Sequence, residues 1–232
     1  MADLRAEPRK GARSIKEIPA KVLMALELGE IETANLVEWL ALNPYHLLRS
    51  QLLQLDLFQS YKTHWESLLR EAPKGINARQ KHIAEFWFTL HGAHTQKNIL
   101  SFGKINKSDT VRAWTAYSSM HQPLDSLAKR LQVIEPLAND PHFGVREVAW
   151  MAFRPYVSAQ PREALKALEA WFASPKENLR RFASEVSRPR GVWCAHIAFF
   201  KEDPTPAFPL LEQLKSDPSK YVRDSLANWL ND

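Results

Sequence analysis

One short pattern occurs four times in the second half of the chain and limits its fold more than any other feature. Each copy opens with a residue of the N-cap type, and five positions later come Val or Leu and then Arg; the copies are residues 106–112, 140–146, 174–180 and 217–223. In three copies Pro follows the opening residue, where it would be the first residue of a helix. Successive copies begin 34, 34 and 43 residues apart. This period predicts a solenoid of helical hairpins.

The rest of the chain is also predicted to form helices joined by short connections. Apolar residues recur at helical spacing before three of the caps, and these runs should form the first helix of each hairpin: residues 124–138, 161–173 and 205–215. The first half contains five further helical runs without a clean repeat: residues 15–28, 33–42, 45–58, 61–71 and 77–91. We therefore expect an all-α protein with a mobile basic tail over residues 1–13 and a single helical-repeat domain over residues 14–232.

Composition narrows the cellular setting and the partners. A formal charge of +5 and a pI near 9.3 are compatible with nucleic acid as the partner. Cys194 is the single cysteine, so no internal disulfide can form and a reducing cytoplasm is expected. The charged N-terminus has no apolar core of a secretory signal, and no apolar run reaches the ~18 residues of a membrane span.

Motifs of common cofactor and metal enzymes are absent from the sequence. It contains no Gly-x-Gly-x-x-Gly, no Walker loop and no His-Glu-x-x-His. The eight histidines show no metal-ligand spacing, and Cys194 and His196 form a lone pair without a second cluster. We therefore expect no metal and no cofactor.

The longest interval between copies contains an arginine-rich segment. Its nine extra residues fall after Glu185, and insertions in solenoids usually form loops, often on the binding face. Residues 178–193 carry four arginines around the single carboxylate of Glu185 and end on Trp193. Guanidinium groups suit a polyanion, and a carboxylate suits a cationic centre.

The same residue types recur at helical spacing along neighbouring helices. Arg146, Trp150 and Arg154 are four residues apart, with Glu147 beside them, and Arg181 and Glu185 are also four apart. Stacking such helices would place the arginines side by side in a basic groove. The candidate DNA-binding residues are Arg112, Arg146, Trp150, Arg154, Arg180, Arg181, Arg188, Arg190, Trp193 and Arg223.

Each candidate also has a structural interpretation. An arginine after Val in a solenoid helix can pair with an acid of the next repeat, and Trp150 can belong to the core. Glu147, Asp109 and Asp224 lie near helix N-termini, where the helix dipole favours acids. Glu185 can pair with Arg181 one turn away.

Four segments resemble the HEAT-like repeat DNA alkylation repair proteins of the AlkD and AlkC group. They are residues 143–147, 152–155, 180–193 with its Ser-Glu-Val-Ser-Arg-Pro-Arg run, and 221–232, so that the resemblance covers roughly residues 109–232. The resemblance implies a right-handed superhelix of antiparallel HEAT-like helix pairs that holds duplex DNA in a concave groove. It further implies a monomeric, monofunctional glycosylase that removes cationic N3- or N7-alkylated purines without a cofactor, with Glu147 and Glu185 as the catalytic carboxylates and the arginines on phosphates.

The sequence departs from this family at one pair of residues. Members of the AlkD type carry Trp and Asp four residues apart, whereas here Trp114 is followed at that distance by Ser118. Three hypotheses therefore remain open: an alkylpurine DNA glycosylase, with Asp109 as a reserve acid; a non-catalytic scaffold that recognises DNA by its shape; and a protein-binding solenoid whose arginines form ion pairs between repeats.

Overall fold

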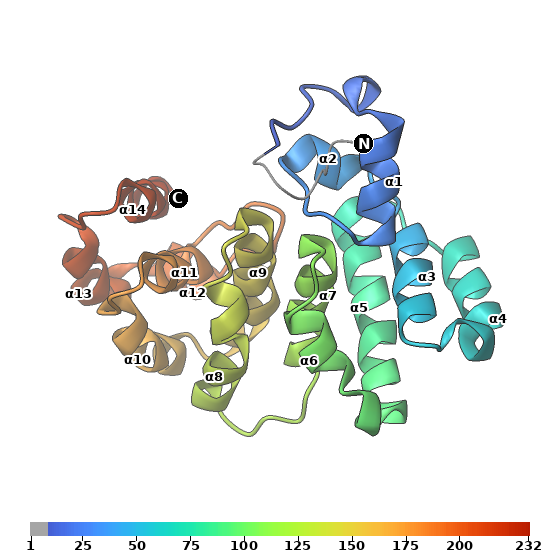
Figure 1. Ribbon diagram of the computed structural model, residues 1–232. Helices are drawn as coiled ribbons and strands as arrows, with labels where there is room; N and C mark the ends of the chain where they lie inside the picture. Colours follow the sequence, from blue (N-terminus) through green and yellow to red (C-terminus); the bar gives the residue numbers. More distant parts are fainter. Residues whose placement is uncertain (1–8) are drawn as a thin grey trace. The chain divides into compact units, whose positions relative to one another are not determined.

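The computed structural model describes residues 9–232, and every regular element within this range is helical. It contains fourteen α-helices and four short 3-10 helices, so the predicted all-α class is confirmed. The described residues pack into two compact units, the first ending at residue 121 and the second covering residues 122–232, each with its own core (Figure 1). The single-domain boundaries proposed from the sequence stay a prediction.

The first unit, as far as residues 9–121 describe it, contains seven α-helices. Their bounds are α1 Ala20–Leu28, α2 Leu36–Ala41, α3 Pro44–Gln54, α4 Phe58–Arg70, α5 Ile76–Ala93, α6 Ile99–Lys104 and α7 Asp109–Met120, with 3-10 turns η1 Ile15–Glu17 and η2 Thr95–Lys97. Every residue of α7 is buried, and α5 and α6 pack against it.

Two predicted runs of this unit are interrupted, each for a backbone reason. Residues 15–28 begin as η1, and α1 starts only after Pro19, whose ring and missing N–H disfavour the helix interior. Residues 45–58 are split between α3 and α4, because Asp56 adopts a left-handed conformation with φ of 56°.

Residues 1–8 of the predicted tail lie outside the described residues. The next residues contact the region of α2: Arg9 donates two hydrogen bonds of 2.9 Å to the Glu38 carboxylate, and Asn35 Nδ2 donates to the Ala12 carbonyl at 2.8 Å. These contacts attach residues 9–12 to the region of α2, and the mobile tail over residues 1–13 stays a prediction.

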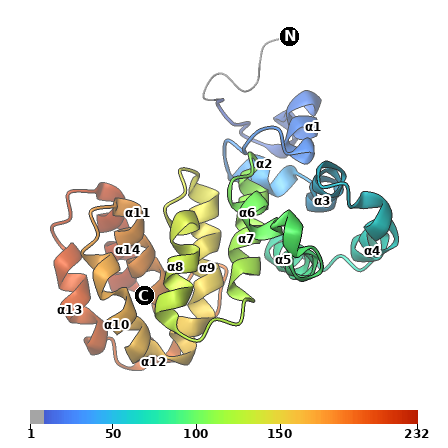
Figure 2. The same cartoon turned by 60° about the horizontal axis from the view of Figure 1, so that its bottom comes forward.

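The second unit consists of helices that pair in the predicted order. Their bounds are α8 Leu127–Ala138, α9 Phe143–Ala159, α10 Pro161–Phe172, α11 Glu177–Ser187, α12 Ala198–Glu202, α13 Phe208–Leu211 and α14 Lys220–Asn231, with 3-10 turns η3 Thr205–Ala207 and η4 Glu212–Leu214. Helix α8 packs on α9 and α10 on α11, while α11 also contacts α9 and α14 (Figures 1 and 2). The predicted helix over 205–215 is instead η3, α13 and η4, because Pro206 and Pro209 remove backbone donors.

The opening residue of each repeat copy was predicted to be an N-cap, and this prediction was wrong by two residues. Helices α7, α9, α11 and α14 begin three residues later, after Ser108, His142, Lys176 and Ser219. The opening side chains instead accept a hydrogen bond from the N–H two residues on, at 2.9 Å for Asn106, 2.8 Å for Asp140, 3.2 Å for Ser174 and 2.9 Å for Asp217. They form turns of the Asx or Ser type, which compete with the cap geometry.

The arginine that closes each copy holds this turn against its own helix. In all four copies Nη1 donates to the carbonyls of the two opening residues: Arg112 at 2.8 and 3.2 Å, Arg146 at 2.7 and 2.8 Å, Arg180 at 2.8 and 3.2 Å, and Arg223 to Asp217 and, at 3.1 Å, to Pro218. The spacing of the pattern thus matches the reach of a guanidinium group. Ion pairs to another segment also occur, between Arg112 and Glu32 and between Arg180 and Asp217.

The Arg180–Asp217 pair predicts an acid-sensitive contribution to stability. Arg180 donates hydrogen bonds of 2.6 and 2.8 Å to the buried Asp217, which lowers the pKa of that carboxyl. A carboxylate with a lowered pKa stabilises the fold fully above its unfolded pKa of about 3.9, and this contribution is lost as pH falls through the folded pKa. Asp217→Asn should therefore cost about 3 kcal/mol of unfolding free energy at neutral pH.

Urea unfolding of wild type and Asp217→Asn, from neutral pH down to full protonation of Asp217, measures how much the Asp217 charge contributes to the free energy of unfolding. The difference between the two proteins should begin to shrink below about pH 4, where the unfolded chain takes up protons, and should disappear as pH falls through the lowered pKa of the folded carboxyl. A difference that stays constant down to full protonation would show that the pair does not act through the charge of Asp217.

Candidate functional site

A chain of alternating acidic and basic side chains joins three helices of the second unit. Glu147 of α9 pairs with Arg181 of α11 at 2.7 Å, and Arg181 also lies 3.5 Å from Glu185 one turn later. Arg188, which ends α11, lies 3.1 Å from Glu185, and its Nε and Nη2 each lie 2.9 Å from the carboxylate of Asp232. Both predicted catalytic carboxylates therefore belong to one network, linked through Arg181.

Glu147 is the more accessible of the two predicted carboxylates. Its side chain is 33% exposed, whereas that of Glu185 is 4% exposed. One Glu147 oxygen accepts a 2.9 Å hydrogen bond from the indole of Trp150, and the other faces Arg181. The carboxylate is therefore fixed from two sides and still reaches solvent, which suits contact with a substrate.

Glu185 occupies the interior of the network. It lies between the guanidinium groups of Arg181 and Arg188, one and nearly one turn away on the same helix. This placement agrees with its structural interpretation as an ion-pair partner. A buried carboxylate between two cations can hold both in place without meeting a substrate.

Tyr221 of α14 joins the same cluster and was not predicted from the sequence. Its ring centroid lies 4.3 Å from the Arg181 guanidinium carbon and 5.3 Å from that of Arg146, so both cations face one aromatic ring. Burial lowers the pKa of Arg181, but the charges of Glu147 and Glu185 outweigh it and the net shift is upward. Arg181 therefore stays charged.

Two predicted DNA contacts lie inside the protein. Trp150 is 2% exposed and Arg154 is 3% exposed, so neither side chain faces solvent with Arg146 as the predicted stripe requires. Helix α9 packs against α8, α10 and α11, which leaves little of its circumference free. Arg154 donates to the carbonyls of Val186, Arg188 and Ala195 at 2.7 to 3.1 Å, and burial lowers its pKa.

Of the remaining residues predicted to contact DNA, some are bound to other groups of the protein and others are exposed to solvent. Arg112 is buried in the first unit, and Arg180 is bound to Asp217 and two carbonyls. Hydrogen bonds to Asp232 raise the pKa of Arg188. Exposed side chains are those of Arg190, Arg223 and Trp193, the last with 65% of its surface accessible.

Trp114 and Ser118, which stand where members of the AlkD type carry Trp and Asp, lie in the core of the first unit. Trp114 is fully buried, and Ser118 Oγ donates to the Ala84 carbonyl at 2.7 Å. Asp109, the reserve acid, is 1% exposed and accepts hydrogen bonds of 3.0 and 2.7 Å from the N–H and hydroxyl of Thr33. None of the three is placed to reach a surface ligand.

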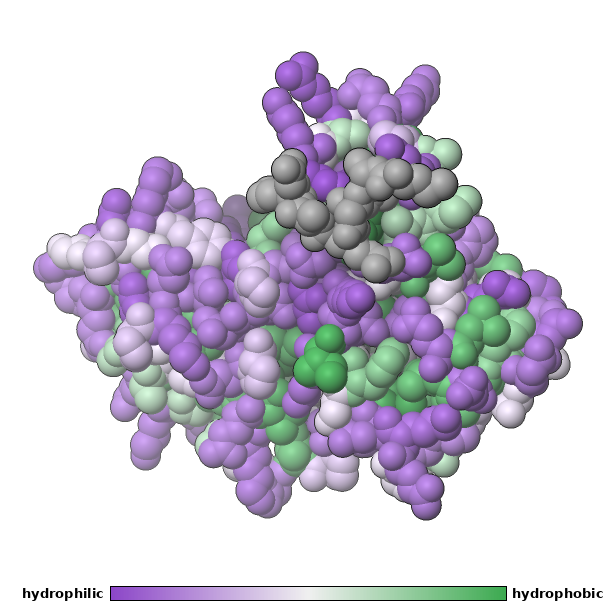
Figure 3. Space-filling view, in the orientation of Figure 1, coloured by the Kyte–Doolittle hydropathy of each residue, from purple (hydrophilic) through white to green (hydrophobic). Residues whose placement is uncertain are grey.

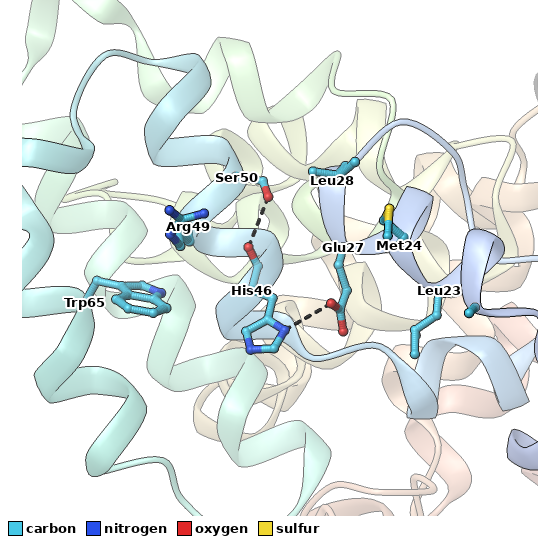
Figure 4. Close-up of a pocket in the computed structure, with 9 residues that line it drawn as sticks. Leu23, Met24, Glu27, Leu28, His46, Arg49, Ser50 and Trp65 are labelled. Atoms are coloured by element: carbon cyan, nitrogen blue, oxygen red, sulfur yellow. Dashed lines mark hydrogen bonds and ion pairs between the residues drawn. The ribbon is translucent and has the colours of Figure 1, made fainter.

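A separate pocket of about 520 Å³ lies in the first unit between α1, α3 and α4 (Figure 4). Leu23, Met24 and Leu28 form its apolar side, and small hydrophobic areas are visible over this unit on the right of Figure 3. Glu27 and His46 hydrogen-bond to each other at 3.0 Å across the pocket. The carboxylate network shares no residue with it.

Two further features of residues 9–232 bear on the site. No group of three or more His, Cys, Asp and Glu side chains in this range is placed to hold a metal ion. None of the helices described there is both long enough and apolar enough to cross a bilayer.

Comparison with known proteins finds a solved structure with a similar fold and a protein whose sequence is similar over part of this chain. No protein-family model matches the chain. The uncharacterized protein YhaZ of Bacillus subtilis (strain 168) is 46% identical over 81 residues, which are 35% of this chain and 23% of that protein. A solved structure of the alkylpurine DNA glycosylase AlkC of Pseudomonas fluorescens, bound to DNA containing an abasic site analog, matches 81% of this chain with a TM-score of 0.61 and 24% identity.

The chain covers 52% of that solved protein and a smaller share of YhaZ. The structural likeness therefore establishes that the chain shares the helical fold of AlkC.

The network predicts that its two glutamates differ in their effect on stability. Glu185→Gln leaves Arg181 and Arg188 without their shared buried carboxylate and should cost about 3 kcal/mol. Glu147→Gln keeps one acceptor oxygen, replaces the other by an amide NH2 group and removes a partly exposed charge, while Arg181 retains Glu185, so it should cost less than about 1 kcal/mol. Chemical denaturation of the two variants measures this difference, and equal losses would contradict the assigned positions.

Proposed function

We propose that this protein acts in DNA alkylation repair as an AlkC-like glycosylase. It would bind duplex DNA and hydrolyse the N-glycosidic bond of cationic N3- or N7-alkylated purines. The observation that carries the proposal is Glu147, a partly exposed carboxylate fixed by Trp150 and Arg181 within a fold shared with AlkC. A monomer in the cytoplasm is the proposed form, in keeping with a single cysteine and a basic chain.

The chemistry of such a lesion requires little more than a placed carboxylate. An alkylated purine carries a positive charge and leaves as a neutral base when its bond to C1′ breaks, so positive charge moves onto the sugar. A nearby carboxylate stabilises that charge. Water then forms the new bond to C1′ and loses one proton, which Glu147 would accept and pass to solvent.

The surrounding residues would serve as positioning groups. Trp150 and Arg181 each bind one oxygen of Glu147, so the carboxylate keeps one orientation. Glu185 and Tyr221 hold Arg181 in turn, by charge and by ring contact. Glu185 thus acts on the reaction through Arg181, whereas Glu147 would face the sugar.

The exposed arginines of the second unit suit the DNA backbone. Arg190 and Arg223 are solvent-accessible, and a guanidinium group can bind phosphate oxygens in pairs. Each such contact releases a counterion, so binding should weaken steeply as salt is added.

A non-catalytic DNA-binding scaffold is the second candidate, and two observations favour it. Ser118 stands where the Trp-x-x-x-Asp pair would have its acid, and it is buried with Trp114. Arg181 also neutralises much of the charge of Glu147. Such a scaffold would bind structured DNA and release no base.

Base release from methylated DNA separates the two candidates. Wild type should release methylated purines, measured by chromatography, in proportion to protein added. Glu147→Gln should lower the release at least about 100-fold with little change in DNA affinity, because the substitution removes charge from the carboxylate site and leaves the exposed arginines in place. Glu169→Gln, an exposed glutamate on α10, is the matched control and should behave as wild type.

Binding without release by wild type would select the scaffold. Release that persists at the wild-type rate in Glu147→Gln, in Glu185→Gln and in the double variant would overturn the residue assignment while keeping the activity. Absence of salt-sensitive DNA binding would overturn both candidates and favour a protein-binding solenoid.

A further inference from the structure

The loop after α11 is held at both ends by internal hydrogen bonds. Ile197 N–H donates to the Pro189 carbonyl at 2.9 Å and so closes residues 189–197 into a compact loop. The buried Arg154 donates to the Arg188 carbonyl just before the loop at 2.7 Å and to the Ala195 carbonyl near its end at 3.0 Å. Arg190 N–H donates to Asp232 at 3.2 Å. The loop is therefore attached to α9 and to the end of α14.

Close contacts within the loop leave little freedom for its backbone. A Cβ atom on Gly191 would lie 2.1 Å from Cys194 Sγ and 3.1 Å from the guanidinium carbon of Arg154, so a larger residue requires movement. The loop presents its next two side chains outward: Val192 is 55% exposed and Trp193 is 65% exposed.

Trp193 combines two unfavourable features. Its φ of 66° is in the left-handed region, which bulky residues avoid. Its indole is exposed, and among residues 9–232 no aromatic ring or cation stacks on it. A strained backbone that exposes a large aromatic side chain is unfavourable for folding alone, and such strain is typical of binding sites.

We infer that Trp193 is a stacking residue for a nucleobase whose face is exposed at a distorted step of duplex DNA. The inference rests on the proposed function. An indole stacks on the π-face of any base, and duplex DNA exposes such a face only where a neighbouring base is missing or displaced. Arg190, exposed three residues before it, supplies a cation for the flanking phosphate.

A stacking Trp193 would make the protein prefer a duplex with a gap in its base stack over a regular duplex, which phosphate contacts alone cannot do. Arginine contacts bind intact and damaged duplexes about equally, because both carry the same backbone charge. A stacking indole adds affinity only where a base is unstacked. Trp193 would therefore discriminate between a regular duplex and one with a gap in its base stack.

Binding to two matched duplexes tests the inference. One is intact, and the other carries a single non-cleavable abasic analogue with 2-aminopurine beside it. Trp193→Ala should weaken binding to the abasic duplex about 10- to 100-fold and leave the intact duplex unchanged, whereas Trp193→Phe should retain most of the difference. Quenching of 2-aminopurine by wild type should disappear in Trp193→Ala. Leu230→Ala, which removes another exposed apolar side chain, should change neither affinity.

A stability measurement separates this role from a structural one. Trp193→Gly relieves the left-handed strain and should raise Tm by about 2–4 °C while abolishing the preference for the abasic duplex.

Equal weakening of binding to both duplexes by Trp193→Ala, or no weakening of binding to either, would overturn the inference. Release of methylated purines by wild type, measured separately, tests the proposed glycosylase function independently of the role of Trp193. If wild type binds neither duplex, the inference and the proposed function both fail.

Discussion

The arginine that closes each repeat copy fixes the start of one helix, and the second unit depends on this contact. The guanidinium group binds two carbonyls of the turn before its own helix, in the same way at Arg112, Arg146, Arg180 and Arg223. Without it, these carbonyls would lack a partner at a partly buried helix entrance. Because the contact recurs, α9, α11 and α14 each begin after a turn that is held in the same way. The facing side chains of these three helices can then form a single network.

The network of acidic and basic side chains explains how charged groups can be nearly buried in the second unit. Arg181 and Arg188 are nearly buried, and each touches two carboxylates, so their charges are compensated locally. Tyr221 adds an aromatic face to Arg181. The arrangement leaves Glu147 as the carboxylate with the largest exposed fraction among the three most central acids, Glu147, Glu185 and Asp232. A fixed, accessible carboxylate of this kind suits contact with a cationic group.

Periodicity predicted most of the long helices and the pairing order in the second unit, because burial of an apolar stripe determines both, but it did not predict the short helices α6 and α12. Turn chemistry was harder to predict: Asp140 and Asp217 can cap a helix or form an Asx turn, and only the Pro that follows and the arginine six residues on favour the turn. Helical spacing placed Trp150 and Arg154 in line with Arg146, but it could not show that three neighbouring helices cover them. The role of Tyr221 was not predictable, since its partner Arg181 lies on another helix 40 positions earlier.

We propose that Glu147 faces the reacting sugar and that the protein is a glycosylase. The most direct test of this proposal is the single-turnover rate of base loss from a duplex with one 7-methylguanine, with protein in saturating excess. We expect a rate far above spontaneous depurination for wild type, and a rate close to the spontaneous one for Glu147→Gln at equal saturation. A wild-type rate equal to spontaneous loss on fully bound DNA would contradict it.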